Sequence, residues 1–292
     1  MTNFGKRVFW KIYSFGWLDH LSDKTFLKLC YRVRSDKKLH LNNPVLFSEK
    51  MQWLKIYDRK PIYTQMSDKY GARKFVADRI GDEYLVELYG VWDDFDSIDF
   101  DSLPDSFVLK CTHDSGGLCI CRDKSNFNIA RAKAKINSSL NRNYYYHCRE
   151  WPYKDIKPRI IAERFLEDNI KDYKFYCFNG EVKYLYVSQG LENHSTANIS
   201  FYDLNFNQMP FYRSDYKPFD HKIDKPLNFE KMIELAAVLA KDLPFIRVDF
   251  YDVDGKIYFS ELTFYPCSGF IPFGPPGWDE KMGNMLELPI NK

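Results

Sequence analysis

The order of apolar and polar positions divides the chain into a helical first part and a second part dominated by strands. Apolar residues recur at close to helical spacing at Leu46, Met51, Leu54 and Ile56. The next segment opens at Ser67, a residue type favoured at helix N-caps, and closes at Gly81, a type favoured at helix C-termini. Residues 1–80 are therefore expected to form mainly helices.

Strand patterns begin after residue 80. Short apolar or alternating runs bounded by turn residues predict strands at residues 84–92, 106–111, 117–121, 159–165, 172–178 and 182–188. Asn179 and Gly180 give a strong hairpin signal between the last two runs. Helical spacing returns at residues 129–140 and again after Asn228, a candidate N-cap. This mixture predicts an α+β protein.

An acidic segment separates the two parts. Around Pro104 it carries the aspartates Asp93, Asp94, Asp96, Asp99, Asp101 and Asp105. Such a cluster could bind a metal ion, but Asp, Ser and Pro are also typical of a solvated linker, which is the interpretation we favour. We therefore expect a helical N-terminal extension at residues 1–100 and a second domain at residues 101–292.

Composition narrows the class of protein. With 45% hydrophobic and 28% charged residues, the 292-residue chain can build a sizeable core and is not disordered. Its net charge of +2 gives no general attraction to nucleic acid, so no nucleic-acid partner is expected. The seven cysteines include no CxxC pair and predict reduced thiols in a cytoplasmic protein. Neither a secretory signal nor a membrane-spanning stretch is expected.

The first 40 residues depart from this charge balance. They contain nine Lys and Arg against three Asp, a net charge of +6, whereas the whole chain has +2. The aromatic residues among them are Phe4, Phe9, Trp10, Tyr13, Phe15 and Trp17. A basic, aromatic segment is suited to peripheral contact with an anionic membrane surface. A helix packed on the rest of the protein is the alternative, which we favour slightly at this point.

Candidate chemistry lies in three groups, and the first is a hairpin with charges inside its strands. Alternation places Arg247 and Asp249 on one face of the first strand, and Glu261 and Thr263 on one face of the second. Two carboxylates that share a face could bind Mg²⁺ together with substrate phosphates. The alternative is that both acids face solvent, with Arg247 as their ion-pair partner.

The length of the hairpin turn decides whether these two acids meet. A two-residue turn at residues 254–255 would send them to opposite faces in a regular ladder. A three-residue turn would make them diagonal neighbours, with α-carbons roughly 7–8 Å apart. Three-residue turns favour a left-handed last residue, which suits Gly255. We therefore expect the three-residue turn.

The second and third groups surround three other strands. Lys110 ends a strand and precedes a glycine-containing loop at residues 115–117, where backbone N–H groups and the lysine could hold phosphate. A tight hairpin turn is the alternative for this loop. Glu163 closes a later strand, and Asp172 and Lys174 share one face of the next. Each of these charges alone could lie on the surface.

In this order, the three groups resemble those of the ATP-grasp superfamily, in which two α+β lobes hold ATP between them. Within it, the chain is similar to the TupA-like ATP-grasp family of bacterial polysaccharide gene clusters. The resemblance is carried by EKMQWLKIYDR, SDKYGARKFV, FVLKCTHDSGG, RIIAERFL, DYKFYCFNGE and RVDFYDVDGKIYFSELTFYPCSGF, which span most of residues 48–273. It implies an ATP-grasp fold, with antiparallel sheets, for residues 101–292.

The resemblance also implies roles for the three groups, with ATP and Mg²⁺ as cofactors. ATP would be bound by Lys110, Ser115, Gly116, Gly117 and Lys174 at its phosphates, by Glu163, Arg164, Phe165 and Leu166 at its adenine, and by Asp172 at its ribose. Asp249 and Glu261 would bind Mg²⁺, and Arg247 would stabilise the transferring phosphoryl group. Many relatives have Asn as a further metal ligand where this chain has Thr263, a weaker ligand. The candidate catalytic residues are thus Lys110, Lys174 and Arg247.

The activity implied by the resemblance is that of an ATP-dependent carboxylate–amine ligase. ATP would phosphorylate the carboxylate, an amine would attack the acyl phosphate, and ADP and phosphate would leave. The family setting suggests a uronic acid sugar, an amino acid or a peptide as a substrate in cell-surface polysaccharide biosynthesis. Many relatives bind the acceptor with a preceding α/β domain, which the helical first part does not match. A glycosyltransferase, a kinase and a nucleotide-binding scaffold are the alternatives.

Overall fold

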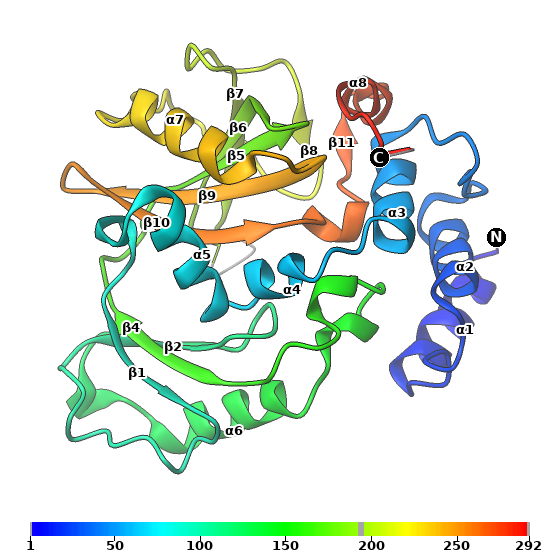
Figure 1. The fold of residues 1–292 in the computed structure, drawn as a ribbon. Coiled ribbons are helices and arrows are strands. Elements are labelled where there is room, and N and C mark those ends of the chain that lie inside the picture. The colour runs from blue at the N-terminus through cyan, green and yellow to red at the C-terminus, as the bar shows by residue number, and fades with distance from the viewer. Residues whose placement is uncertain (1, 192–195, 291–292) are drawn as a thin grey trace.

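Two antiparallel sheets face one another in the computed structural model of the chain, which describes residues 2–191 and 196–290 (Figure 1). The large sheet has the order β10-β9-β5-β6-β7, with strands β5 (Asp172–Phe178), β6 (Glu181–Gln189), β7 (Asn198–Tyr202), β9 (Phe245–Val253) and β10 (Lys256–Thr263). The small sheet has the order β1-β4-β2-β3, with strands β1 (Leu88–Trp92), β2 (Phe107–Cys111), β3 (Leu118–Cys121) and β4 (Ile160–Arg164). The short strands β8 (Tyr212–Arg213) and β11 (Phe273–Gly274) form a separate pair. The expected α+β class is confirmed.

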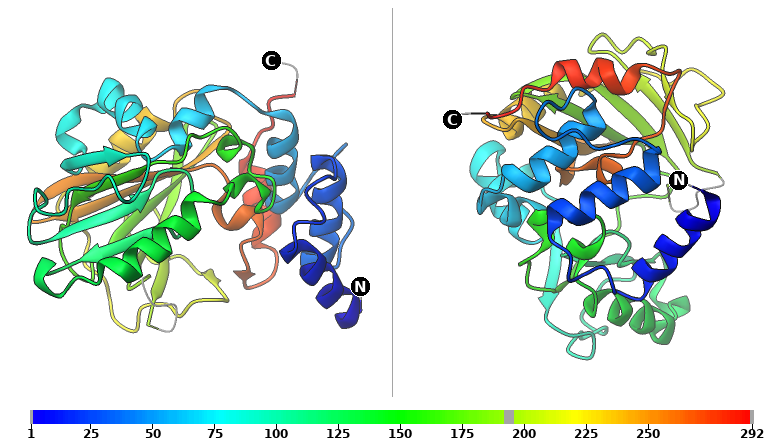
Figure 2. Two further views of the ribbon diagram at one scale, coloured as in Figure 1. Left: turned by 90° about the horizontal axis from the view of Figure 1, so that it is seen from below. Right: turned by 90° about the vertical axis from the view of Figure 1, so that its right-hand side faces the viewer.

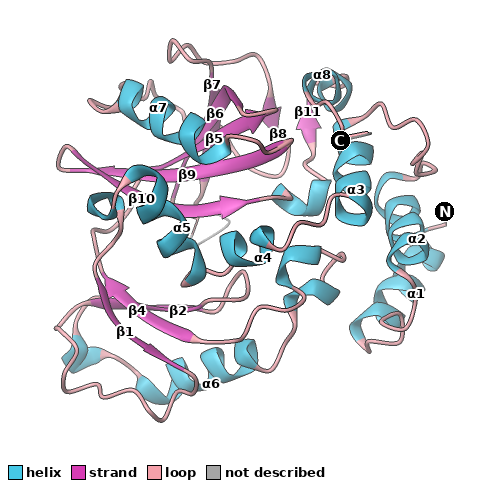
Figure 3. Ribbon diagram, in the orientation of Figure 1, coloured by secondary structure: helices cyan, strands magenta, loops and turns pink. Residues whose placement is uncertain are grey.

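Helices lie on the outer faces of both sheets, between the two sheets and at one end of the molecule (Figure 3). They are α1 (Asn3–Ser14), α2 (Asp23–Ser35), α3 (Phe47–Tyr57), α4 (Ile62–Ser67), α5 (Gly71–Ile80), α6 (Ile129–Leu140), α7 (Phe229–Ala240) and α8 (Trp278–Met285). Short 3₁₀ helices occur at Asp82–Tyr84, Lys124–Asn126, Tyr144–Tyr146, Trp151–Tyr153 and Pro266–Gly269. α7 packs on the outer side of the large sheet and α6 on the outer side of the small sheet. α1 and α2 lie at the end far from β1 (Figures 1 and 2).

The large sheet has one apolar face and one face that turns polar along its length. On the apolar face, Phe175 packs against Phe250 and against Phe229 of α7. The opposite face, which is turned toward the small sheet, is apolar only at one end, where Phe47 of α3 contacts Phe245 with ring centroids 5.2 Å apart. Because α3 closes that end, only the other end of this face is available for polar side chains.

Element predictions were most accurate where the spacing is regular. The helix expected at residues 129–140 is confirmed as α6. The helix expected between Ser67 and Gly81 is shorter than predicted, because Ser67 is the last residue of α4 and α5 begins only at Gly71. Gly81 does end α5, with φ 107°. The strand expected at residues 84–92 is shorter and only half-buried, since β1 begins at Leu88.

The acidic segment is packed rather than loose. Its apolar residues Phe95, Ile98 and Leu103 are buried in the core of the small sheet. Its aspartates face outward, and Asp93 accepts a hydrogen bond from Lys157 at 2.7 Å. The expectation of a solvated linker is therefore wrong. The domain division at residue 100 stays a prediction; β1, which precedes it, is paired with β4, which follows it.

A buried lysine attaches α3 to loops from both sheets. The ammonium group of Lys55, which is fully buried, donates to the carbonyl oxygens of Cys148 at 3.0 Å and Ser268 at 2.9 Å. The hydroxyl of Ser268 donates to Glu150 at 2.5 Å. Burial raises the pKa of Glu150 to about 7, although the charge of Lys55 opposes this shift. Thus one carboxyl group at this junction is partly protonated near neutral pH.

The substitution Glu150→Gln should flatten the pH dependence of stability. In the folded state Glu150 keeps its proton up to a pH of about 7, whereas the unfolded chain loses it near pH ~4.3. The free energy of unfolding should therefore fall as pH rises through this window, by roughly 1–3 kcal/mol. Urea unfolding at pH 5 and pH 7.5 would measure the difference. Glu280→Gln, at an exposed position, is the control; an unchanged slope in Glu150→Gln would contradict the expectation.

Candidate active site

A row of four side chains crosses the large sheet on the face turned toward the small sheet. The strand register pairs Tyr186 with Lys174, Lys174 with Asp249, and Asp249 with Glu261. Directly paired residues of neighbouring strands point to the same side of a sheet. The four side chains therefore form one line across β6, β5, β9 and β10. We call Tyr186, Lys174, Asp249 and Glu261 the polar row.

The hairpin of β9 and β10 has a two-residue turn. Val253 pairs with Lys256, so that only Asp254 and Gly255 lie between the strands. Both turn residues have positive φ angles, 51° and 73°, as a type I′ turn requires. The expected three-residue turn is wrong, because Asp tolerates the left-handed region well enough to occupy the first turn position.

A β-bulge nevertheless brings the two acids together. The register shifts between Phe259 and Glu261, which leaves Ser260 as the extra residue. Without this bulge, Ser260 would pair with Asp249 and Glu261 would turn to the other face. With it, Glu261 lies directly opposite Asp249 rather than diagonal to it. The acids do share a face, as the sequence predicted, but for a different structural reason.

Two cations neutralise Asp249, which is completely buried. The Nε and Nη2 atoms of Arg247 donate to its two oxygens at 2.7 and 2.6 Å, and Lys174 Nζ donates to Oδ2 at 2.6 Å. Lys174 also bonds Asp172. Arg247 reaches further, to Glu261 at 2.8 Å and Thr263 at 2.9 Å. The alternative in which both acids face solvent with Arg247 as partner is therefore wrong for Asp249, while Glu261 is 41% exposed.

The pKa values of the two acids beside these cations, Glu261 and Asp172, are shifted in opposite directions. Burial would raise the pKa of Glu261, but Lys174, Arg247 and the nearby Lys69 outweigh it and lower the pKa to about 2. Burial raises the pKa of Asp172 to about 6, although Lys174 opposes it and Asp249 adds to it. Asp172 Oδ1 is buried and has no hydrogen-bond partner within the described residues. This oxygen is thus available to a ligand in the cleft.

The small sheet presents a second charged group to the same space. Lys110 Nζ donates to Glu163 at 2.7 Å, and Arg73 Nη1 donates to the other oxygen of Glu163 at 2.8 Å. Arg73 also donates to the carbonyl oxygen of Val86 at 2.8 Å. The carboxylate of Glu163 therefore holds two cations at the end of β4, and raises the pKa of Lys110 although burial opposes this.

The loop after β2 is glycine-dependent. Gly116 has φ 117°, a conformation that other residues rarely adopt. At Gly117, a β-carbon would lie 2.5 Å from Ser139 Oγ and 2.7 Å from Cys111 Cβ. His113 is buried, and its Nε2 lies 3.2 Å from the Ser139 carbonyl oxygen. The loop backbone, rather than His113, faces the cleft.

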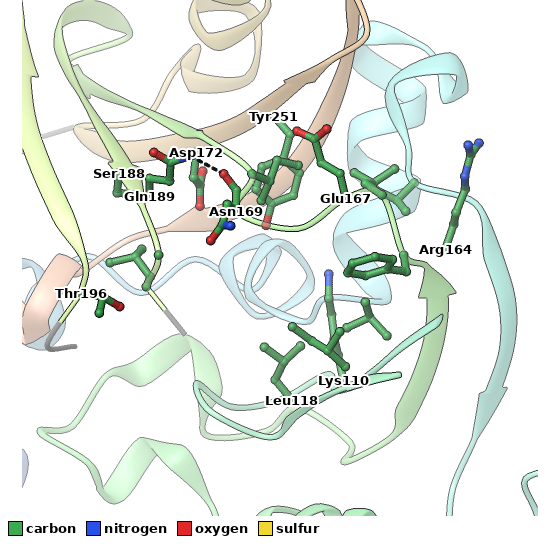
Figure 4. Close-up of a pocket in the computed structure, with 18 residues that line it drawn as sticks. Lys110, Leu118, Arg164, Glu167, Asn169, Asp172, Ser188, Gln189, Thr196 and Tyr251 are labelled. Carbon is green, nitrogen blue, oxygen red and sulfur yellow. Dashed lines mark hydrogen bonds between the residues drawn. The ribbon is translucent and has the colours of Figure 1, made fainter. Parts of the chain in front are cut away.

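Two adjoining cavities lie between the sheets. The first has a volume of about 390 Å³ and apolar walls, among them Val86, Val108, Leu118, Ile120, Phe165, Leu166, Ile170 and Leu191. Figure 4 shows Lys110 rising from the small sheet toward Asp172 and Tyr251 of the large sheet, with Arg164 pointing away from them. The second, of about 330 Å³, is lined by the residues of the glycine loop and by Glu163, Lys174 and Glu261. An apolar chamber therefore opens into a charged one.

Two cations of the second cavity were not identified from the sequence. Lys69 and Arg73 come from the α4–α5 region, to which no site role was assigned from the sequence. The backbone N–H of Lys69 donates to the carbonyl oxygen of Thr112 at 3.0 Å, and its side-chain ammonium group donates to the backbone carbonyl oxygen of Asp114. The two cations are four residues apart in SDKYGARKFV; in the structure Lys69 lies in the turn before α5 and Arg73 in the first turn of α5.

The donor set fits a Mg²⁺ ion that is shared with a phosphate ligand. Asp249, Glu261 and Thr263 offer carboxylate and hydroxyl oxygens on adjacent strands, the ligand type that Mg²⁺ prefers. In the described ranges, no group of three or more Asp, Glu, His or Cys side chains could hold a metal ion by itself.

The fold and the cleft define an ATP-grasp protein. The family model described as TupA-like ATPgrasp matches residues 49–287, and the chain belongs to this family. The expected fold is thereby confirmed, and no curated protein matches the chain. Along residues 2–191 and 196–290, no helix is both long enough and apolar enough to cross a bilayer.

Several solved structures with a similar fold are ligases. D-alanine–D-alanine ligase from Bacillus anthracis is 16% identical with a TM-score of 0.40, and the match covers 74% of this chain and 59% of that one. The enzyme from Helicobacter pylori is 14% identical with a TM-score of 0.41, covering 82% and 69%. L-amino acid ligase from Bacillus licheniformis is 14% identical with a TM-score of 0.44, covering 76% and 49%. The chain thus spans about three-fifths of the length of the first of these.

Replacing Lys174 by Met should destabilise the fold as well as change the site. Asp172 and Asp249 would lose the cation between them, and breaking a buried ion pair costs about 3–5 kcal/mol. The double variant Asp172→Asn with Lys174→Met should recover part of this loss, because one buried carboxylate is then neutral. Urea unfolding of both, beside Lys183→Met at an exposed position of β6, would measure it. Equal effects of Lys174→Met and Lys183→Met would contradict the burial argument.

Proposed function

We propose that the protein is an ADP-forming ligase that joins a carboxylate to an amine and activates the carboxylate as an acyl phosphate. The observation that supports this most strongly is the polar row with Arg247, which faces Lys110 and the glycine loop across a cleft. Such a face is suited to a triphosphate and to a phosphoryl group in transfer, since both carry negative charge on several oxygens.

The two cavities suggest how the nucleotide would lie. The apolar cavity fits a flat base, with residues 163–166 as its backbone edge; the Arg164 N–H is already bonded to the Glu87 carbonyl oxygen at 2.9 Å. Asp172, whose Oδ1 has no partner in the described part of the chain, would accept a ribose hydroxyl. The phosphates would then lie in the charged cavity beside Lys110, Lys174 and the glycine loop.

The charges of the second cavity would act on the transferring phosphoryl group. Mg²⁺, when bound by Asp249 and Glu261, would supply positive charge to the phosphate oxygens. Arg247 is held in place by three partners, so it would meet developing charge without reorganising. The carboxylates raise the pKa of Lys174, which therefore stays charged at neutral pH. These side chains would bind and orient the phosphates.

For the substrates, we propose a uronic acid sugar, an amino acid or a peptide used in the biosynthesis of a cell-surface polysaccharide. The family's setting supports this choice.

The isotopic label of the carboxylate tests the reaction. Carboxylate and amine pairs would first be screened with ATP for an amide product by mass spectrometry. With an ¹⁸O-labelled carboxylate, one labelled oxygen should appear in inorganic phosphate, because amine attack breaks the bond between the acyl carbon and that oxygen. An amide formed alongside unlabelled phosphate would contradict the acyl phosphate. A phosphorylated acceptor with no free phosphate would identify a kinase instead.

A further inference from the structure

Helix α1 carries apolar side chains on two sides. Its inner side, with Phe9, Trp10 and Tyr13, packs against the buried cluster around Phe26 of α2. In the sequence, packing on the rest of the protein and contact with a membrane were alternatives. The packing accounts for these inner aromatic residues only, so the outer side of α1 needs a separate explanation.

The outer side of α1 is apolar and exposed. Phe4, Val8, Lys11 and the C-cap residue Phe15 follow at intervals of four, three and four residues, which places them within about 60° of one another around the helix. Phe4 is 77% exposed and Phe15 is 61% exposed. Trp17, in the turn after α1, is 69% exposed, and its ring lies 5.7 Å from that of Phe15. We call Phe4, Val8, Phe15 and Trp17 the outer apolar face.

Unpaired cations accompany the outer apolar face. Arg7 and Lys11 are exposed, and within the described ranges neither has a carboxylate at ion-pair distance. The acids of this region are engaged elsewhere. Asp36 pairs with Lys6 at 2.5 Å and Asp23 with Arg59 at 2.5 Å. On α2, the exposed positions Lys24, Lys28 and Arg32 form a second stripe of cations at four-residue spacing. The segment therefore presents a positive surface.

We propose that the outer apolar face docks on an anionic phospholipid surface, a partner that the ligase function does not require. Exposed aromatic side chains insert between lipid headgroups, and adjacent Lys and Arg contact the anionic phosphates. Three features favour a lipid surface over a protein partner. The cations are unpaired, the face lies on one convex helix rather than in a groove, and α1 lies at the outer end of the molecule, where a flat surface can reach it (Figure 2).

Vesicle sedimentation of the full-length protein tests this proposal. Sucrose-loaded vesicles of phosphatidylcholine, with and without 30% phosphatidylglycerol, would be used at about 50 mM and 500 mM salt. The wild-type protein should sediment with the anionic vesicles at low salt, and less at high salt, because salt screens the cations. The triple variant Phe4→Ser, Phe15→Ser and Trp17→Ser should bind at least about tenfold more weakly.

Matched variants separate this face from the general surface. Leu227→Ser removes another exposed apolar residue, 87% exposed, and should leave binding unchanged. Arg7→Gln with Lys11→Gln should weaken binding to anionic vesicles only, whereas Lys222→Gln with Lys241→Gln, also exposed, should not. Thermal unfolding would show whether each variant is folded. If the triple variant is unfolded, the Arg7→Gln, Lys11→Gln variant alone tests the proposal.

Three outcomes would overturn the proposal. The first is that the wild-type protein does not bind anionic vesicles at low salt. The second is that the triple and charge variants bind as the wild type does, so that another surface is responsible. The third is that the wild type is a dimer in solution and the triple variant a monomer, which would assign the outer apolar face to a second copy of the chain.

Discussion

The structure depends on placing a charged carboxylate where no water reaches it. Asp249 lies on β9, between β10 and β5 of the large sheet; it is completely buried, and both of its oxygens are bonded to cations. Removing a carboxylate from water costs several kcal/mol, which two cations offset only if the geometry is good. Since an apolar residue would fill this position at less cost, the charge is better explained by function than by stability. Arg247, Lys174 and Glu261 are all placed by the need to neutralise or share this charge.

The α4–α5 segment forms part of the cleft wall. α4 and α5 pack on the large sheet through apolar residues such as Tyr63 and Phe75. Toward the small sheet, the same segment makes polar contacts, with Asp68 bonded to Arg159 at 2.6 Å and Arg73 to Glu163. A segment bound by packing on one side and by hydrogen bonds on the other joins the two sheets, and it adds Lys69 and Arg73 to the charged cavity.

Local sequence patterns correctly predicted the features that depend on the spacing of neighbouring residues. Helix α6 and the sharing of one face by Asp172 and Lys174 follow from spacing alone. The way in which Glu261 meets Asp249 does not, because a single extra residue, Ser260, changes the register and only the packed sheet determines where a bulge forms. The acidic segment was misjudged for a similar reason. Its aspartates dominate the composition, but the apolar residues between them decide its burial.

Cations from distant parts of the chain were the hardest to predict. Lys69 and Arg73 meet the glycine loop and Glu163 only after the chain has folded, across sequence separations of 45 and 90 residues. The sequence shows that they are four residues apart, but it does not show what their side chains contact. By contrast, Glu163 was identified from its position at a strand end, and its partners in the structure explain why a charge is tolerated there.

Metal binding in the presence of nucleotide tests the central claim most directly, namely that the carboxylates of the polar row serve a metal–nucleotide ligand. Binding of Mn²⁺, which has an electron-spin signal and takes Mg²⁺ sites, would be titrated with a non-hydrolysable ATP analogue. The wild type should bind Mn²⁺ with the analogue, and Glu261→Gln should weaken this binding at least about tenfold, because a carboxylate ligand is lost. Glu234→Gln, at an exposed position of α7, should have no effect. Equal Mn²⁺ affinity in wild type and Glu261→Gln would contradict the account.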